Sequence, residues 1–205
     1  MNVSGLAHLR ECMFSQLNNT LISAFVERWQ PDTNTFHMPF GEMTITLHDV
    51  YFILGLPIDG LFVNSTSEKE DLVYTASELL GINVNDLLAS WPNGGPKLEK
   101  IRLCCSNDGV PTETQAGGYI TYLLGSTLLI DKTGTNVKPL FIECFQDFES
   151  IPQYSWGSAA LAYLFRQLGI ASRAKCAQLG GCLTLLEVSF ISVLLFSSNI
   201  CIYES

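Results

Sequence analysis

Apolar residues at helical spacing open the most informative part of the chain. They are Leu21, Ile22, Phe25, Val26 and Trp29, with charged residues between them. One apolar face of this width predicts an amphipathic helix over residues 21–29. A polar side chain among residues 18–20 can cap its start. Pro31 ends it, because the residue before a proline leaves the helical region.

β-branched and aromatic residues around a Pro/Gly turn follow directly. Residues 35–38, which include Phe36, and residues 43–45 flank a turn over residues 39–42 that contains Gly41. This pattern predicts a short β-hairpin near residues 35–45.

The next helix has a boundary signal at each end. Thr46 and Asp49 have the spacing of a capping box in front of an apolar run. Gly55 suits the left-handed position that ends a helix, and Pro57 prevents the helix from resuming.

The remaining segments predict more helices. We expect polar loops and short helices in the middle of the chain: loops over residues 64–71 and 91–96, and helices over residues 77–80 and 85–89. A helix over residues 112–129 contains three glycines, which indicate either close helix packing or a break. Another, over residues 156–168, is capped by Ser155 and stopped by Gly169. A last helix begins near Gly181. The fold class is mainly α, or α+β at most: a multi-helix domain with one short hairpin.

Composition limits the classes of function. With 205 residues, 47% of them hydrophobic, one globular domain is expected. A net charge of −9 disfavours direct, non-specific binding to nucleic acid. The seven cysteines include no Cys-x-x-Cys pair, so no zinc site is predicted and the thiols are expected to be reduced inside a cell. No apolar signal peptide is recognised in residues 1–16, so we do not expect secretion.

The C-terminal segment is apolar and free of formal charge over residues 188–203. Glu187 and several serines make it a poor membrane span. We favour a buried helix or strand, or an unnatural tail, and a tail-anchored membrane protein stands as the alternative.

Asp131-Lys132-Thr133-Gly134 spells the phosphorylation motif of cation-pumping P-type ATPases, in which the aspartate accepts phosphate. The carboxylates that would hold magnesium are missing from the sequence around it, since Asp147 is the one aspartate that follows. The same residues make a good β-turn with glycine at the fourth position, and we favour that interpretation.

Other catalytic constellations are not recognised. The three histidines, His8, His37 and His48, have no local partner pattern, so surface or core roles are expected. No phosphate-binding glycine loop, nucleophile elbow or pyridoxal-phosphate lysine context is present in the sequence. We therefore predict no catalytic residue, no metal site and no cofactor.

Three blocks in order, at residues 21–60, 119–162 and 180–186, closely resemble the plant mobile domain. The signature positions are Trp29, Pro31, Phe36, Gly41, Thr46, Gly55, Pro57, Asp131, Gly134, Trp156 and Gly157. In this family the Asp-Lys-Thr-Gly run is an ordinary feature, which agrees with a turn.

The resemblance implies a function without a reaction. Such domains are similar to those of the Maintenance-of-Meristems proteins and of certain plant transposable elements. They are linked to transposon silencing, gene expression and meristem maintenance in the nucleus, with a phosphatase-like partner of the serine/threonine class or a chromatin-associated one. The family also carries the label "aminotransferase-like", although no established catalytic residues accompany it. We expect a non-catalytic protein-interaction domain with a protein partner, and neither a membrane nor direct nucleic-acid binding.

The resemblance ends near residue 186. We expect a partial plant mobile domain over residues 1–186 and a divergent apolar tail over residues 187–205, as in a truncated, transposon-derived member. The alternatives are an enzyme, either an aspartyl-phosphate phosphohydrolase using Asp131 or an aminotransferase-like protein, and the tail-anchored membrane protein.

Overall fold

The computed structural model describes residues 6–12, 18–65, 67–93, 95–106, 109–137, 139–174 and 179–203. Its α-helices are α1 (Asn19–Arg28), α2 (Leu47–Leu54), α3 (Lys69–Leu80), α4 (Val84–Ser90), α5 (Leu98–Cys105), α6 (Thr112–Thr127), α7 (Trp156–Ala174) and α8 (Leu183–Tyr203). The short 3-10 helices are η1 (Ala7–Cys12), η2 (Trp91–Asn93), η3 (Pro139–Phe145) and η4 (Ile151–Gln153). The predicted fold class, mainly α with a small β element, is confirmed.

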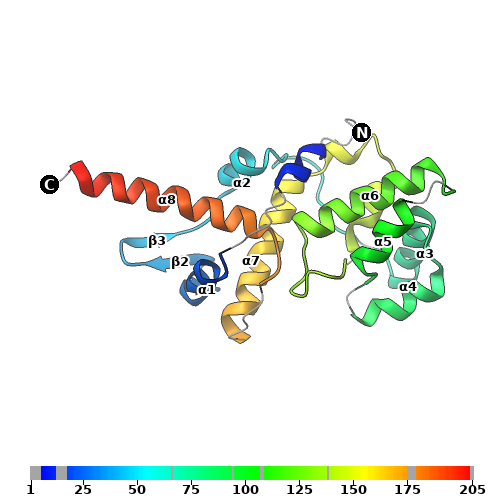
Figure 1. Ribbon diagram of the computed structural model, residues 1–205, viewed down its shortest axis with the longest axis horizontal. Coiled ribbons are helices and arrows are strands. Elements are labelled where there is room, and N and C mark those ends of the chain that lie inside the picture. The colour runs from blue at the N-terminus through cyan, green and yellow to red at the C-terminus, as the bar shows by residue number, and fades with distance from the viewer. Residues whose placement is uncertain are drawn as a thin grey trace.

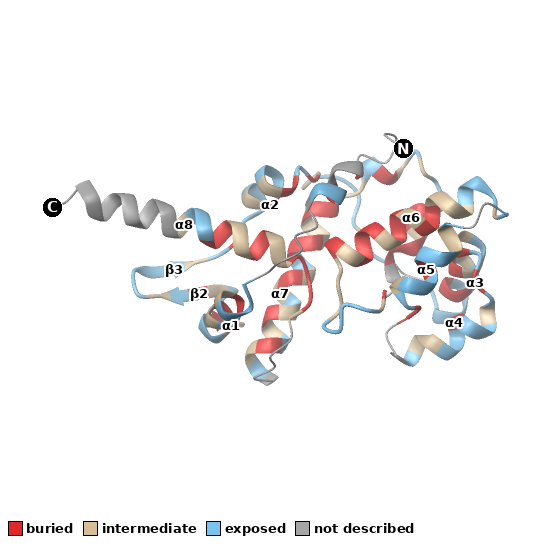
Figure 2. Ribbon diagram, viewed as in Figure 1, coloured by how far each residue is buried: buried red, intermediate tan, exposed pale blue. Residues whose placement is uncertain are grey.

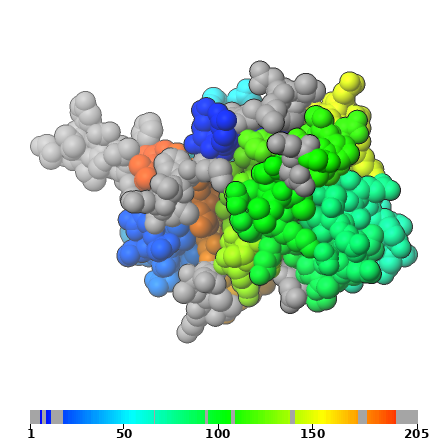
Figure 3. Space-filling model, turned by 45° about the vertical axis from the view of Figure 1, so that its right-hand side comes forward, coloured from blue at the N-terminus to red at the C-terminus, as the bar shows by residue number. Residues whose placement is uncertain are grey.

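Helix α7 runs through the middle of the molecule (Figure 1). On one side lie α1, α2, the strands and α8; on the other lie α3 to α6. The space-filling view shows α3 to α6, in green and teal, as one continuous block (Figure 3). Buried residues are concentrated along α6 and α7 (Figure 2) and belong to one connected hydrophobic core.

The caps predicted for the first two helices are confirmed. The Asn18 side chain accepts a hydrogen bond from the Leu21 amide and so caps α1. Thr46 and Asp49 form the complete capping box of α2, with Thr46 N donating to Asp49 Oδ2 over 2.7 Å. Gly55 ends α2 in the left-handed conformation, at φ 62°, where a residue without Cβ is not strained.

The hairpin is part of a three-stranded antiparallel sheet, ordered β1 (Trp29–Gln30), β2 (Thr35–Met38), β3 (Gly41–Met43). The sequence predicted helix up to Trp29, but this residue is extended and pairs with Phe36. Its indole packs against the rings of Phe36 and Phe165, at centroid distances of 4.6 and 5.1 Å. The free energy gained by burying the Trp29 side chain is therefore larger than the gain from extending α1 by one residue. β3 begins at Gly41, earlier than expected.

Three helices correct the sequence prediction, two in a boundary and one in its existence. α3 begins at Lys69, so the predicted loop is shorter and the helix is longer than residues 77–80. α5 was not predicted; Ile101 is its one buried residue, which leaves a weak apolar pattern. α7 passes through Gly169 to Ala174, because buried Leu168 and Ala171 on both sides of the glycine hold the helix against the core.

The glycines of α6 lie where neighbouring segments approach closely. A Cβ on Gly117 would come within 2.6 Å of Leu79 in α3, and one on Gly118 within 2.9 Å of Cys105 in α5. Close packing, rather than a break in the helix, therefore accounts for these glycines.

Helix α8 begins where the sequence predicted a last helix, and its first turns enter the core. Phe190 is fully buried and packs against Phe25 and Phe36. The core therefore includes a residue beyond position 186. Side chains from residue 194 onward lie outside the described part. Among the described residues, no helix combines the length and apolar character needed to cross a lipid bilayer.

Candidate functional site

Two signature blocks that are about a hundred residues apart in the chain form one joint. The Gly157 amide donates to the Pro57 carbonyl over 2.8 Å, and Ser158 Oγ donates to the Ile58 carbonyl over 2.7 Å. Leu61 pairs with Tyr154 in an isolated parallel bridge. Ser155, the predicted cap of α7, directs its hydroxyl to the Leu61 carbonyl over 3.0 Å. The joint fixes the segment after α2 onto the start of α7.

The signature residues inside the joint are tightly packed. Trp156 is 1% exposed and donates its indole N–H to the Ile151 carbonyl over 2.8 Å. A Cβ on Gly157 would lie 3.0 Å from atoms of Val50, Pro57 and Ile58. These residues pack the domain and are not directed toward a ligand.

The Asp131 segment is a turn, as the sequence favoured. The Gly134 amide donates to the Asp131 carbonyl over 3.0 Å, and Gly134 has φ 65°. The Asp131 carboxylate accepts hydrogen bonds from the Thr133 hydroxyl at 2.6 Å and from the Thr135 amide at 3.1 Å. Its oxygens therefore organise the turn that contains them.

The N-terminal signature residues are also structural in position. Trp29 and Phe36 are buried against each other, and Thr46 caps α2. Pro31 follows β1 in a turn, and Gly41 begins β3 with φ 131°.

Histidine and cysteine side chains are the usual bases and nucleophiles of a catalytic site. His37 Nε2 lies 3.1 Å from Glu42 across the hairpin, and both side chains are more than half exposed. Burial raises the pKa of the Cys144 thiol to about 11, despite a hydrogen bond with Tyr154 that opposes the shift. The side chains of His8, Cys12, Cys176 and Cys201 lie outside the described part. Among the residues that are described, no three His, Cys, Asp or Glu side chains cluster as metal ligands would.

Helix α2 carries an exposed apolar surface, which we call the α2 aromatic surface: Leu47, His48, Tyr51 and Phe52. Tyr51 is 53% and Phe52 is 74% exposed. The Phe52 ring lies 5.4 Å from the His48 ring and 5.5 Å from the Tyr51 ring. The opposite side of the helix, with Val50 and Leu54, is buried. Aromatic rings grouped in this way on a folded domain are typical of a contact surface.

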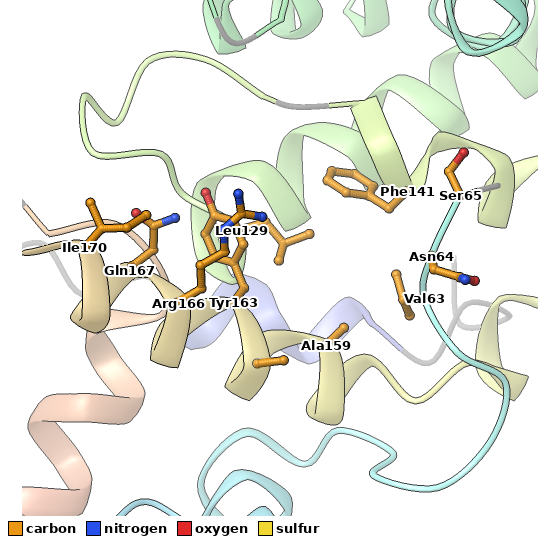
Figure 4. Close-up of a pocket in the computed structure, with 11 residues that line it drawn as sticks. Val63, Asn64, Ser65, Leu129, Phe141, Ala159, Tyr163, Arg166, Gln167 and Ile170 are labelled. Atoms are coloured by element: carbon orange, nitrogen blue, oxygen red, sulfur yellow. The ribbon is translucent and has the colours of Figure 1, made fainter. Parts of the chain in front are cut away.

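A cleft of about 450 Å³ lies along α7 (Figure 4). Its lining residues are Val63, Asn64, Ser65, Leu129, Phe141, Ala159, Ala162, Tyr163, Arg166, Gln167 and Ile170. Most of these are apolar, and they come from α7, from η3, from the segment just after α6 and from the segment after the joint. The cleft has the volume of a typical ligand site.

Three polar side chains of the cleft project from α7: Tyr163, Arg166 and Gln167 (Figure 4). Asn64 and Ser65 line it from the segment after the joint. Burial raises the pKa of Tyr163, Asp131 raises it further, and Arg166 partly offsets both. Tyr163 is therefore a neutral hydrogen-bond donor at physiological pH. The cleft was not predicted from the sequence, because its far wall comes from residues 63–65 and 141.

The described part of the chain is thus a helical scaffold with signature residues in its joint and turns, an exposed aromatic helix face and an apolar cleft with a polar edge. The chain belongs to the plant mobile domain family, whose model matches residues 5–191. This confirms the family resemblance seen in the sequence.

Relatives in Arabidopsis thaliana cover most of the chain. Protein MAINTENANCE OF MERISTEMS is 41% identical over 180 residues, which are 83% of this chain and 36% of that protein. Protein MAIN-LIKE 1 is 39% identical over 198 residues, 90% of this chain and 37% of the relative. A protein named serine/threonine-protein phosphatase 7 long form homolog is 36% identical over 187 residues, 90% of this chain and 14% of that protein.

The chain therefore spans little more than a third of the length of the first two relatives. No solved structure has significant similarity to it.

Proposed function

We propose that this chain is a non-catalytic protein-interaction domain that acts in the plant nucleus, in transposon silencing, control of gene expression and meristem maintenance. The α2 aromatic surface carries the proposal, because two aromatic rings more than half exposed on one helix favour contact with another protein. The name of the MAINTENANCE OF MERISTEMS relative supports the biological context.

The signature residues support a scaffold without chemistry of its own. Trp156 and Gly157 are enclosed by the joint, and the Asp131 carboxylate holds its own turn. A nucleophile needs a base or metal beside it and access to a substrate. These contacts instead direct the polar atoms into the fold.

A phosphatase-like protein of the serine/threonine class is the proposed partner. The support is a relative whose name is that of a serine/threonine-protein phosphatase and which contains a segment similar to this chain. A chromatin-associated protein is the second candidate partner, from the family resemblance.

The test is binding of the purified chain to a purified phosphatase-like plant protein of this class, measured by calorimetry. The Tyr51→Ser, Phe52→Ser double variant is expected to lose binding, since it removes both rings without touching the buried side of α2. Tyr74→Ser is the matched control, because Tyr74 is 61% exposed on α3, away from this surface.

Equal binding by the wild type and the double variant would refute the role of the α2 aromatic surface. Turnover of a phosphate ester or an amino donor by the purified chain, lost on changing one polar residue, would refute the non-catalytic assignment.

A further inference from the structure

The cleft along α7 combines an apolar floor with a positive charge. Leu129, Phe141 and Ile170 provide apolar surface, and Arg166 is an exposed lining residue. Within the part of the chain that the structure describes, Arg166 has no carboxylate within ion-pair distance, whereas Lys100 pairs with Asp86 and Arg102 with Glu99. An unpaired guanidinium beside an apolar cleft is complementary to a carboxylate next to an apolar group.

The neighbouring polar groups strengthen this match. The neutral Tyr163 hydroxyl and the Gln167 amide are both hydrogen-bond donor groups, and both line the cleft beside Arg166. Asp131 is the acidic group that acts on Tyr163, but it lies in the turn that its own oxygens organise and does not line the cleft, whereas Arg166 does. The Arg166 end of the cleft is therefore the favourable place for an anion.

The shape of the site favours a peptide. The cleft follows α7 from Ala159 to Ile170, about three helical turns, and is bordered on its other side by residues 63–65 (Figure 4). A chain crossing it can place one large apolar side chain between Phe141 and Leu129 while its acidic neighbour reaches Arg166.

We propose that this cleft binds a short segment of a partner protein in which a bulky apolar residue is followed by an acidic one. The proposal rests on the interaction function above and names a second contact, separate from the α2 aromatic surface. Phe141 and Leu129 receive the apolar side chain, and Arg166, with Tyr163 and Gln167, receives the carboxylate.

The test uses the full 205-residue chain and a defined probe, the peptide Gly-Ser-Phe-Asp-Ser-Gly-amide labelled with tetramethylrhodamine at its N-terminus. Two matched peptides replace aspartate by asparagine or phenylalanine by alanine. Binding is followed by fluorescence anisotropy, and the site is located by NMR shifts of Ala162 and Ile170. Each replacement is expected to weaken binding about three- to tenfold, because one removes the charge pair and the other the apolar anchor.

Protein variants locate the same interaction. Arg166→Gln is expected to weaken binding of the aspartate peptide about three- to tenfold and to leave the affinity for the asparagine peptide unchanged. Arg173→Gln is the control, since Arg173 is exposed on the same helix but does not line the cleft. Ala162→Trp should block every peptide by filling the cleft, while Ala89→Trp, at an exposed position on α4, should not.

Equal affinity for the aspartate and asparagine peptides, or shifts confined to residues outside the cleft, would overturn the proposal. So would no shift at Ala162 and Ile170 at millimolar peptide. If the peptide does not bind in the cleft but the phosphatase-like protein still binds the chain, the cleft contact is refuted and the proposed function stands. Peptide binding in the cleft without any binding of that protein would support the cleft contact and refute the proposed partner.

Discussion

Single glycines on α7 differ in how much space surrounds them, and this difference gives a sharp test. A Cβ on Gly157 would meet three atoms at 3.0 Å in the joint, whereas one on Gly169 has Pro31 Cβ at 3.9 Å as its nearest neighbour. Gly157→Ala is expected to destabilise the fold by about 1–3 kcal/mol through overpacking. Gly169→Ala should stabilise it by up to about 1 kcal/mol, because alanine favours helix. Urea unfolding of both variants measures the difference; similar effects would contradict the tight joint.

The Asp131 turn predicts a graded effect of side-chain replacement. Asp131→Asn keeps an oxygen that can accept from the Thr135 amide, so a loss below about 0.5 kcal/mol is expected. Asp131→Ala removes every acceptor of the carboxylate and should cost about 1 kcal/mol. Denaturant unfolding measures both. A magnesium-dependent phosphatase activity abolished by Asp131→Asn would instead restore the aspartyl-phosphate alternative.

The buried thiol of Cys144 predicts a loss of stability in alkali. Its pKa rises from an ordinary 9.0 to about 11 in the folded state, chiefly by desolvation. The unfolded chain therefore loses this proton at lower pH than the folded one, and stability should fall as pH rises from about 9 to 11. Cys144→Ala should be less stable at neutral pH but lose less stability over this interval. An identical pH slope in the two proteins would contradict the assignment.

At the scale of elements, the sequence was informative where a local signal exists. The caps at Asn18, Thr46 and Gly55 lie in the sequence itself, and the helices they delimit were predicted closely. β1 was missed because Trp29 adopts the extended conformation to pack against Phe165, which is distant in the sequence. α5 was missed because it buries little, and the end of α7 because packing overrides a glycine.

Contacts between residues far apart in the sequence also limited the prediction of the candidate site. The signature positions could be named from the sequence, but the joint between residues 57–61 and 153–158 depends on hydrogen bonds across about a hundred residues. The cleft likewise brings Phe141 and Val63 to α7. Local periodicity carries no information on such contacts.

The capping box of α2 predicts a measurable contribution from one hydroxyl. Thr46 Oγ1 accepts from the Asp49 amide at 3.3 Å, and Asp49 Oδ2 accepts from the Thr46 amide at 2.7 Å. Thr46→Ala is expected to cost about 1 kcal/mol of folding free energy. Thr46→Ser keeps the hydroxyl and should stay within about 0.5 kcal/mol of the wild type. Thermal and urea unfolding distinguish them, and equal losses would show that the cap contributes nothing.

At the scale of the whole molecule, one connected core predicts that the two sides of α7 unfold together. Leu164 of α7 and Leu124 of α6 are both fully buried and belong to the same cluster. Leu164→Ala leaves a cavity and should cost about 2–5 kcal/mol. If α3 to α6 and the α1–α8 side form one cooperative unit, amide exchange must speed up by the same factor in the slowest amides of both.

Hydrogen exchange with mass spectrometry measures that factor segment by segment, and Leu124→Ala provides the reciprocal variant from the other side. Faster exchange confined to the side that carries the substitution would mean two separately stable units. In that case the joint at Pro57 and Gly157 would link the units without coupling them. Equal acceleration from both variants would instead show that the α2 aromatic surface and the cleft share one folding equilibrium, so that a ligand bound at either site protects the other from unfolding.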